Sequence, residues 1–182
     1  MIDAIRSRLN IHVRRFARAE SGASAVEFAM VAAPFLALVF AILETALVFF
    51  ASQSLEAAAT DSARLIMTGQ AQTAGWSQSD FKNAVCNRLA GGLFDCANGV
   101  YVDVKTYTSF TSISTTPPIT NGRLDTSNMA YTPGTPGDIV VVRLYYQWPI
   151  VVSMFGDNLS NLNGNQRLLV ATSVFRNEPY GG

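Results

Sequence analysis

Glu27 poses the clearest chemical question in the sequence, because it places a carboxylate at the start of an apolar run. Residues 20–40 read ESGASAVEFAMVAAPFLALVF, and an Arg-rich leader ends at Ser21 and Gly22, just before this acid. A charge beside hydrocarbon costs several kcal/mol unless it is neutralised or stays at the interface. Glu27 is therefore either a hydrated acid at the lipid headgroups or one member of a charge pair.

The other chemically active residue types are not grouped as an enzyme or a metal centre requires. The one histidine, His12, lies in the leader, so a chain that loses the leader has no Ser–His or Cys–His nucleophile. Two cysteines fall short of the four ligands of a structural zinc site, and no glycine-rich phosphate loop stands between a strand and a helix. No spacing singles out a catalytic carboxylate pair. We therefore expect no catalytic residue, no cofactor, no metal and no enzyme activity.

Cys86 and Cys96 both lie beyond the apolar run. Two cysteines in an oxidising compartment are typical of one disulfide that closes a short loop. The alternative is a pair of unpaired, partly buried thiols.

The charges are distributed unevenly along a chain whose net charge is zero. Residues 1–22 carry five Arg against Asp3 and Glu20, about +3, and the remainder carries eight bases and eleven acids, about −3. The main domain thus lacks the basic footprint of a nucleic-acid-binding protein. Positive charge beside a membrane span stays cytoplasmic, so we expect the N-terminus inside and the residues after about position 51 outside.

The apolar run is long enough to cross a membrane. Residues 28–51 are 24 in number and include one ionisable residue, Glu44, whereas a helix needs ~20 residues to cross the hydrocarbon. The run is too long for a cleavable secretory signal. Glu44 lies ~25 Å beyond Glu27 along a helix axis. It is either an acid that reaches the outer interface or a polar contact between neighbouring helices.

The helical pattern continues beyond the membrane. Leu55, Ala59, Ser62 and Ile66 recur at helical spacing, and Gly69 is a plausible terminator. We expect one helix over residues 24–68, with its outer half packed against a domain.

The rest of the chain predicts a short helix and several strands. Ser77 and Asp80 have capping-box spacing and predict a helix that ends at Gly91 and Gly92. Alternation and β-branched content predict strands over 100–107, 138–148 and 167–175, with Pro149 interrupting the second. Residues 108–137, rich in Ser, Thr, Pro and Gly, predict a long loop with room for a short strand.

These elements indicate an α+β fold. A long N-terminal transmembrane helix packs on a small, mostly antiparallel sheet, which needs a cover on one face. We divide the chain into a basic leader over 1–22, a helix over 23–69 that leaves the membrane, and an outer α+β domain over 70–182.

Three stretches resemble the TadE/TadF-like pilus assembly proteins of bacterial tight adherence (Flp pilus) systems. They are RRFARAESGASAVEFAMVAAPFLALVF, YYQWPIVVSMFG and ATSVFRNEPY. The resemblance implies a pilin-like pseudopilin in the inner membrane with a periplasmic domain. It also implies that a prepilin peptidase cuts after Gly22, making Ala23 the new N-terminus. Glu27 then occupies the fifth mature position, with the aromatic Phe28 after it.

Cleavage would create a charged amine at Ala23 beside the apolar segment. The Glu27 carboxylate of one subunit can pair with the amine of another, and a mismatched register would bury an unpaired charge. We therefore expect Glu27 to set subunit register during pilus assembly. The implied partners are the prepilin peptidase, other Tad pilins and pseudopilins, inner-membrane platform proteins and membrane lipid, with no nucleic acid.

Two alternatives remain open. Arg176 and Glu178 either contact a partner or simply end a strand before Pro179. The whole chain, in turn, is either a minor pseudopilin or a permanently anchored periplasmic module whose loops 108–137 and 156–166 bind a ligand or a protein.

Overall fold

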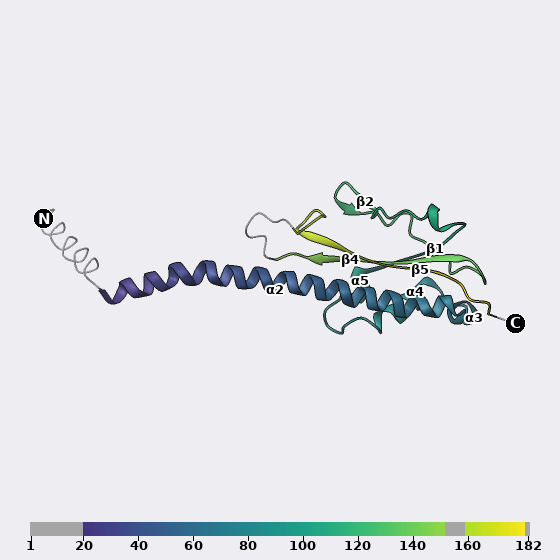
Figure 1. Cartoon of the computed structure of the whole chain (residues 1–182), viewed down its shortest axis with the longest axis horizontal. Coiled ribbons are helices and arrows are strands. Elements are labelled where there is room, and N and C mark those ends of the chain that lie inside the picture. Colours follow the sequence, from purple (N-terminus) through teal and green to yellow (C-terminus); the bar gives the residue numbers. More distant parts are fainter. Residues whose placement is uncertain (1–19, 152–158, 181–182) are drawn as a thin grey trace, which may run out of the picture. The chain divides into compact units, whose positions relative to one another are not determined.

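The computed structural model describes residues 20–151 and 159–180. Most of the basic leader, including His12, and part of the predicted loop 156–166 lie outside the described residues. The chain divides into two units that meet between Leu43 and Glu44. Helix α2 (Glu20–Met67) runs without interruption through Pro34 (Figure 1).

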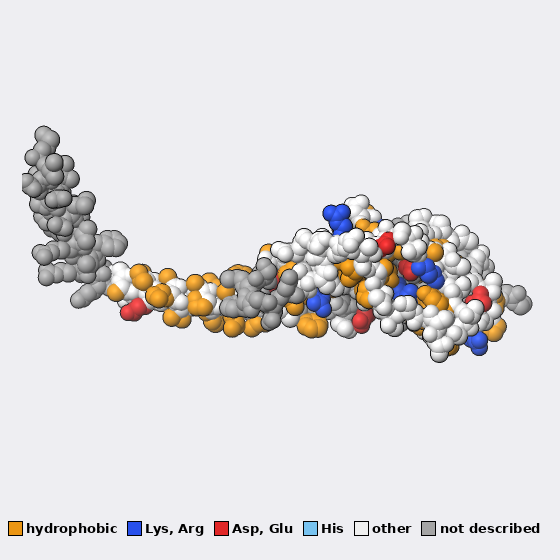
Figure 2. All heavy atoms as spheres, turned by 90° about the horizontal axis from the view of Figure 1, so that it is seen from above, with side chains coloured by type: hydrophobic (Ala, Val, Ile, Leu, Met, Phe, Trp, Pro, Cys, Tyr) orange, Lys and Arg blue, Asp and Glu red, His pale blue; other side chains and the backbone are white. Residues whose placement is uncertain are grey.

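The first unit, as far as it is described, consists of the N-terminal half of α2. Its side chains from Gly22 to Leu43 are exposed or half-buried, and Phe28 is 74% exposed. Hydrophobic side chains cover this half of the helix, and Glu27 is its one charged residue between Gly22 and Leu43 (Figure 2). By length and composition α2 is able to cross a membrane, as the sequence predicts.

The second unit is built on a three-stranded antiparallel sheet. Strands β1 (Val100–Tyr107), β4 (Ile139–Pro149) and β5 (Gln166–Arg176) lie in the order β1-β4-β5. The three predicted strands are confirmed. Pro149 does not interrupt β4 but is its last residue, opposite Gln166, where a missing N–H is least disruptive.

The predicted loop over 108–137 contains more regular structure than expected. It holds a 3-10 turn η1 (Phe110–Ser112) and a hairpin of β2 (Ile119–Thr120) and β3 (Arg123–Leu124). Asn121 and Gly122 form its two-residue turn with φ of 53° and 71°, the left-handed conformation that Asn-Gly hairpin turns adopt.

The outer half of α2 covers one face of the sheet. All four residues of the predicted stripe, Leu55, Ala59, Ser62 and Ile66, are buried. Leu55, Ala59 and Ile66 share a core with valines of β1 and β4 and with Leu169 and Ala171 of β5. The helix contributes mostly small side chains to this core, so that its backbone can approach the sheet closely: Ala51, Ala58, Ala59 and Ala63. The α+β prediction is confirmed.

Short helices connect α2 to the sheet. α2 is followed at Gly69, with φ 77°, by α3 (Gln70–Thr73). α4 (Gln78–Cys86) begins with the predicted capping box, in which Ser77 and Asp80 bond each other's backbone N–H. α5 (Cys96–Gly99) precedes β1.

The predicted end of α4 at Gly91 and Gly92 is wrong. The α-helix ends at Cys86, and the N–H groups of Arg88 and Leu89 then bond the carbonyls three residues back. These tighter turns still bring Leu89 into the core. The apolar stripe therefore continues beyond the last residue of the α-helix, and the sequence pattern does not mark where the helix ends.

Packing of α2 on the sheet predicts opposite responses at two neighbouring alanines. Ala59→Leu overfills the core and should destabilise the domain by about 1–3 kcal/mol, because Ala59 is 1% exposed. Ala57→Leu, on the exposed side of the same turn, is the control and should change stability little. Thermal unfolding of the full chain in detergent micelles measures both, and equal shifts would contradict this packing.

Tyr131 gives a prediction for alkaline pH. Its hydroxyl is buried with no hydrogen-bond partner among the described residues, and its ring packs on Phe81 at 5.7 Å between centroids. Burial, aided by the Asp80 carboxylate, raises the pKa of Tyr131 from 10.0 to about 12. Because the folded pKa is raised, the contribution of neutral Tyr131 is complete below pH 10 and is lost as the pH rises toward about 12.

Tyr131→Phe should therefore fold at least as stably as the wild type at neutral pH, since it removes an unpaired polar atom. Above pH 10.0 it should lose less stability than the wild type. Urea unfolding across this pH range is the measurement. An identical alkaline loss in both proteins would contradict the assignment.

Candidate functional site

The predicted processing segment, here Gly22, Ala23, Glu27 and Phe28, lies within α2. All four residues are exposed in the described chain. Ala23 and Glu27 are one helical turn apart, so they share a face of the helix. The Glu27 carboxylate therefore lies close to the point where a new amine would arise at Ala23.

The peptide bond between Gly22 and Ala23 is unshielded by the described residues. A side chain at Gly22 would meet nothing within 4 Å. Glycine inside a helix costs about 1 kcal/mol relative to alanine, so this turn is more easily unwound than its neighbours. Space and local instability are both features that a peptidase needs at its cutting site.

Glu44, the second acid of the apolar run, has a partner that neither prediction foresaw. It is 9% exposed and accepts a hydrogen bond from the Val151 N–H, just after β4. This partner is backbone of the same chain. The contact joins the beginning of the second unit to the end of β4.

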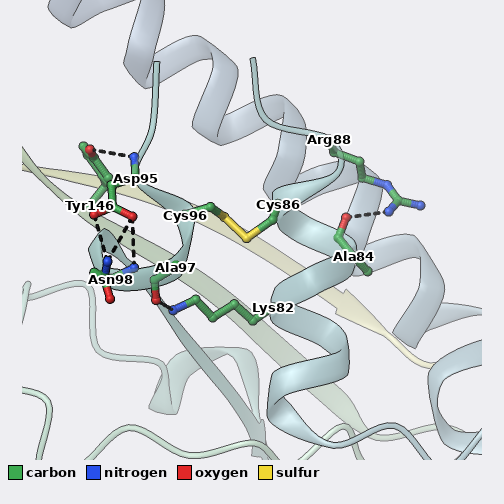
Figure 3. Close-up of a disulfide and its surroundings, with 9 residues drawn as sticks. All are labelled: Lys82, Ala84, Cys86, Arg88, Asp95, Cys96, Ala97, Asn98 and Tyr146. Carbon is green, nitrogen blue, oxygen red and sulfur yellow. Dashed lines mark hydrogen bonds between the residues drawn. A yellow bond between two sulfur atoms is a disulfide. The ribbon is translucent and has the colours of Figure 1, made fainter. Parts of the chain in front are cut away.

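Cys86 and Cys96 are joined by a disulfide, with Cα atoms 5.8 Å apart. It ties the end of α4 to the start of α5, and the Lys82 ammonium adds a 2.8 Å hydrogen bond to the Ala97 carbonyl (Figure 3). The side chain and N–H of Asn98 hydrogen-bond the Asp95 carboxylate and lower its pKa. The cysteines therefore fix a turn and form no reactive site.

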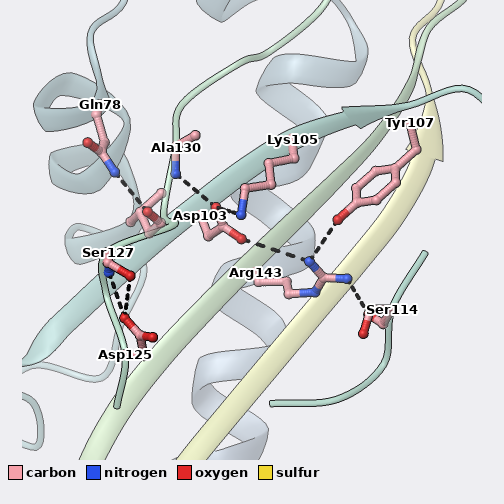
Figure 4. A network of polar contacts seen from close by, with 10 residues as sticks. Gln78, Asp103, Lys105, Tyr107, Ser114, Asp125, Ser127, Ala130 and Arg143 are labelled. Carbon is pink, nitrogen blue, oxygen red and sulfur yellow. Dashed lines mark hydrogen bonds and ion pairs between the residues drawn. The ribbon is translucent and has the colours of Figure 1, made fainter. Parts of the chain in front are cut away.

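A buried carboxylate on β1 was not predicted from the sequence. Asp103 is 4% exposed and accepts a 2.9 Å hydrogen bond from the Ala130 N–H. It also lies 3.0 Å from the Lys105 ammonium and 3.8 Å from the Arg143 guanidinium (Figure 4). Arg143 in turn donates to the Ser114 carbonyl at 2.6 Å. The network anchors the loop over 108–137 to the sheet near both of its ends, at Ser114 and at Ala130.

The two loops named as a binding surface meet at one place. The Asn163 N–H donates to the Gly122 carbonyl at 2.7 Å, and its amide donates to the Asn121 carbonyl at 2.9 Å. An open polar cleft of about 370 Å³ lies there, lined by Gly122, Arg123, Leu124, Gln147, Asn163, Gly164 and Gln166. Arg123 is the one charged residue in this lining.

The segment Arg176–Tyr180 acts mainly within the fold. Arg176 and Glu178 are exposed, but the Glu178 N–H donates to the Met67 carbonyl at the end of α2. Asn177, 3% exposed, donates to the Pro133 and Thr135 carbonyls at 2.9 and 3.1 Å. We call this the C-terminal clasp: Asn177, the Glu178 backbone, and Tyr180.

Tyr180 completes the clasp. Its ring covers Gly69, where an added Cβ would lie 2.1 Å from the ring carbon Cγ. Its hydroxyl donates to the Gly134 carbonyl at 3.2 Å. Glycine at position 69 thus serves both the left-handed end of α2 and the close approach of this ring.

Metal-binding and catalytic groupings do not emerge from the described part of the chain. No three His, Cys, Asp or Glu residues within it come together as metal ligands. The processing segment and the exposed side chains of Arg176 and Glu178 remain the candidate functional residues.

Comparison with known proteins finds a family model that matches most of helix α2. Residues 22–64 match the family model described as TadE-like protein. The resemblance drawn from the sequence is confirmed over that part of the chain. No curated protein and no solved structure matches the chain.

The clasp separates structural residues from those free to contact a partner. Asn177→Ala should destabilise the domain by about 1–3 kcal/mol, because the buried Asn177 amide no longer donates to the Pro133 and Thr135 carbonyls. Arg176→Ala and Glu178→Ala should leave the unfolding temperature nearly unchanged, since both side chains are exposed. Thermal unfolding of the three purified variants is the measurement. A large loss with Glu178→Ala and none with Asn177→Ala would contradict the clasp.

Proposed function

We propose that this chain, whose N-terminal helix matches TadE-like proteins, is a minor pseudopilin that assists assembly of a Tad/Flp-type pilus. The observation that carries the proposal is the family match over residues 22–64. The match starts at Gly22, the residue after which the peptidase would cut. Such a pilus would serve adherence and biofilm formation.

Electrostatics gives Glu27 a role in this proposal. Cleavage after Gly22 leaves an ammonium on Ala23 at the positive end of the helix dipole, an unfavourable place for a cation. Glu27, one turn along, supplies the compensating charge. In a bundle of parallel helices the same carboxylate can pair with the amine of a neighbour. Registers that leave either charge unpaired in lipid are disfavoured.

The proposed orientation has the N-terminus in the cytoplasm and the second unit in the periplasm. The five Arg of residues 1–22 favour it, because positive flanks stay inside. The disulfide between Cys86 and Cys96 would suit the oxidising periplasm. We place the anchor in the inner membrane.

The proposed partners follow from the processing and the span. A prepilin peptidase would act on the Gly22–Ala23 bond. Other Tad pilins or pseudopilins would pack against the exposed apolar half of α2, and inner-membrane platform proteins would receive the assembled helices. Membrane lipid surrounds α2 before assembly.

A permanently anchored binding module is the second candidate. The polar cleft where Asn163 joins the Asn121–Gly122 turn favours it, since the two loops predicted to bind a ligand line this cleft together. This function needs the anchor but no cleavage.

The state of the N-terminus tests the proposal. Intact-mass spectrometry of the membrane protein should show loss of residues 1–22. Gly22→Ala should impair cleavage, because it changes the cutting site. Glu27→Gln should impair pilus assembly, because it removes the charge that pairs with the Ala23 amine. Gly91→Ala and Glu56→Gln are matched controls at exposed sites in the second unit, and both should behave as wild type.

An intact N-terminus on the functional protein would favour the binding module instead. Normal processing and piliation in both Gly22→Ala and Glu27→Gln would refute the pseudopilin assignment.

A further inference from the structure

Exposed apolar side chains continue along α2 beyond Glu44. Val48 and Ala51 turn into the core, while the opposite side of the helix presents large apolar groups to the surroundings. The first fully exposed polar residue after them is Gln53. The exposed apolar residues of this stretch are Leu47, Phe49 and Phe50.

If Glu27 lies at the inner interface, the thickness of a bilayer brings lipid to this stretch. From Phe28 to Leu43 the helix has 16 residues, or ~24 Å, whereas the hydrocarbon is ~30 Å thick. Extending the span to Phe50 gives ~34 Å, enough for a crossing with some tilt. If α2 spans the bilayer, Glu44 therefore lies within the outer leaflet, on the hydrocarbon side of Phe50.

A carboxylate at that depth needs a partner that is not water. Glu44 has one in the Val151 N–H, which comes from the end of β4. This bond brings Val151 to the depth of Glu44. Val151 is 84% exposed, while its neighbour Ile150 is buried in the core.

We propose that the end of β4, through Val151, inserts into the outer leaflet beside α2, so that the domain rests on the lipid surface. Glu44 is the positioning residue that holds this strand end at the membrane. The inference needs α2 to span a membrane but does not need cleavage after Gly22.

Lipid is the occupant favoured by the surface itself. The exposed side chains of Leu47, Phe49 and Phe50 continue the apolar surface of the span, and Val151 adds an exposed apolar side chain at the depth of Glu44. Trp148, partly exposed three residues before Val151, is of the type enriched where membranes meet water. A neighbouring protein would also cover apolar side chains, so the experiment below uses a single chain per nanodisc, in which lipid is the cover that the proposal predicts.

The test places a fluorescent label on Val151→Cys in the full chain, with Cys86 and Cys96 kept as the disulfide. One chain is reconstituted per nanodisc of phosphatidylethanolamine and phosphatidylglycerol. Quenching by nitroxide-bearing lipid is compared with quenching by aqueous iodide. Val174→Cys is the control, because Val174 is also an exposed valine (42%) and lies near the end of β5, far along the sheet from the end of β4.

The label at position 151 should be quenched severalfold more by lipid than the label at 174, and less by iodide. Strong iodide quenching at both positions would overturn the proposal, because Val151 would then face water. Protection of position 151 from both quenchers would overturn it too, because the chain itself would then cover this position.

Glu44 variants test the positioning role separately. Glu44→Ala removes the acceptor for the Val151 N–H and should reduce lipid quenching at position 151. Glu44→Gln keeps an acceptor oxygen and should restore it. The signal at position 174 should stay constant in both, which shows that the sheet remains folded. Unchanged lipid quenching at position 151 in Glu44→Ala would show that Glu44 does not position Val151 at the membrane.

Discussion

The packing of the outer half of α2 on the sheet is the interaction on which the second unit depends. A single three-stranded sheet cannot bury its apolar face alone, and α2 supplies the cover through a face of alanines around Leu55 and Ile66. The other contacts strengthen the edges of this sandwich. The C-terminal clasp closes the end of α2, Glu44 joins the start of its outer half to the residue Val151 after β4, and the disulfide secures the connection through α4.

The two acids of the apolar run meet lipid in different ways. Glu27 is exposed in the described chain, and under the proposed function its counterion is an amine made by proteolysis. Glu44 is buried and already holds a backbone donor. One carboxylate would thus act between molecules and the other within the molecule, although both belong to the same helix.

Local patterns predicted the elements, and long-range contacts account for what was missed. The stripe from Leu55 to Ile66 and the Ser77 capping box depend on residues close together in the sequence, so the sequence predicted them. Asn121-Gly122 was a hairpin signal that the composition of its loop obscured. The burial of Asp103 depends on its register opposite Arg143, and the role of Asn177 depends on Pro133 and Thr135. Neither arrangement can be predicted from the sequence until the pairing of the strands is known.

The order of the core elements along the chain bears on the kinetics of folding. The buried face of α2 ends at Ile66, whereas its partners Leu169 and Ala171 lie about a hundred residues later. Contacts of such separation close slowly, because a long loop must first lose its freedom. During synthesis the alanine face of α2 is complete long before β5 exists. The nascent chain therefore passes through an interval in which this face is bare and prone to aggregation.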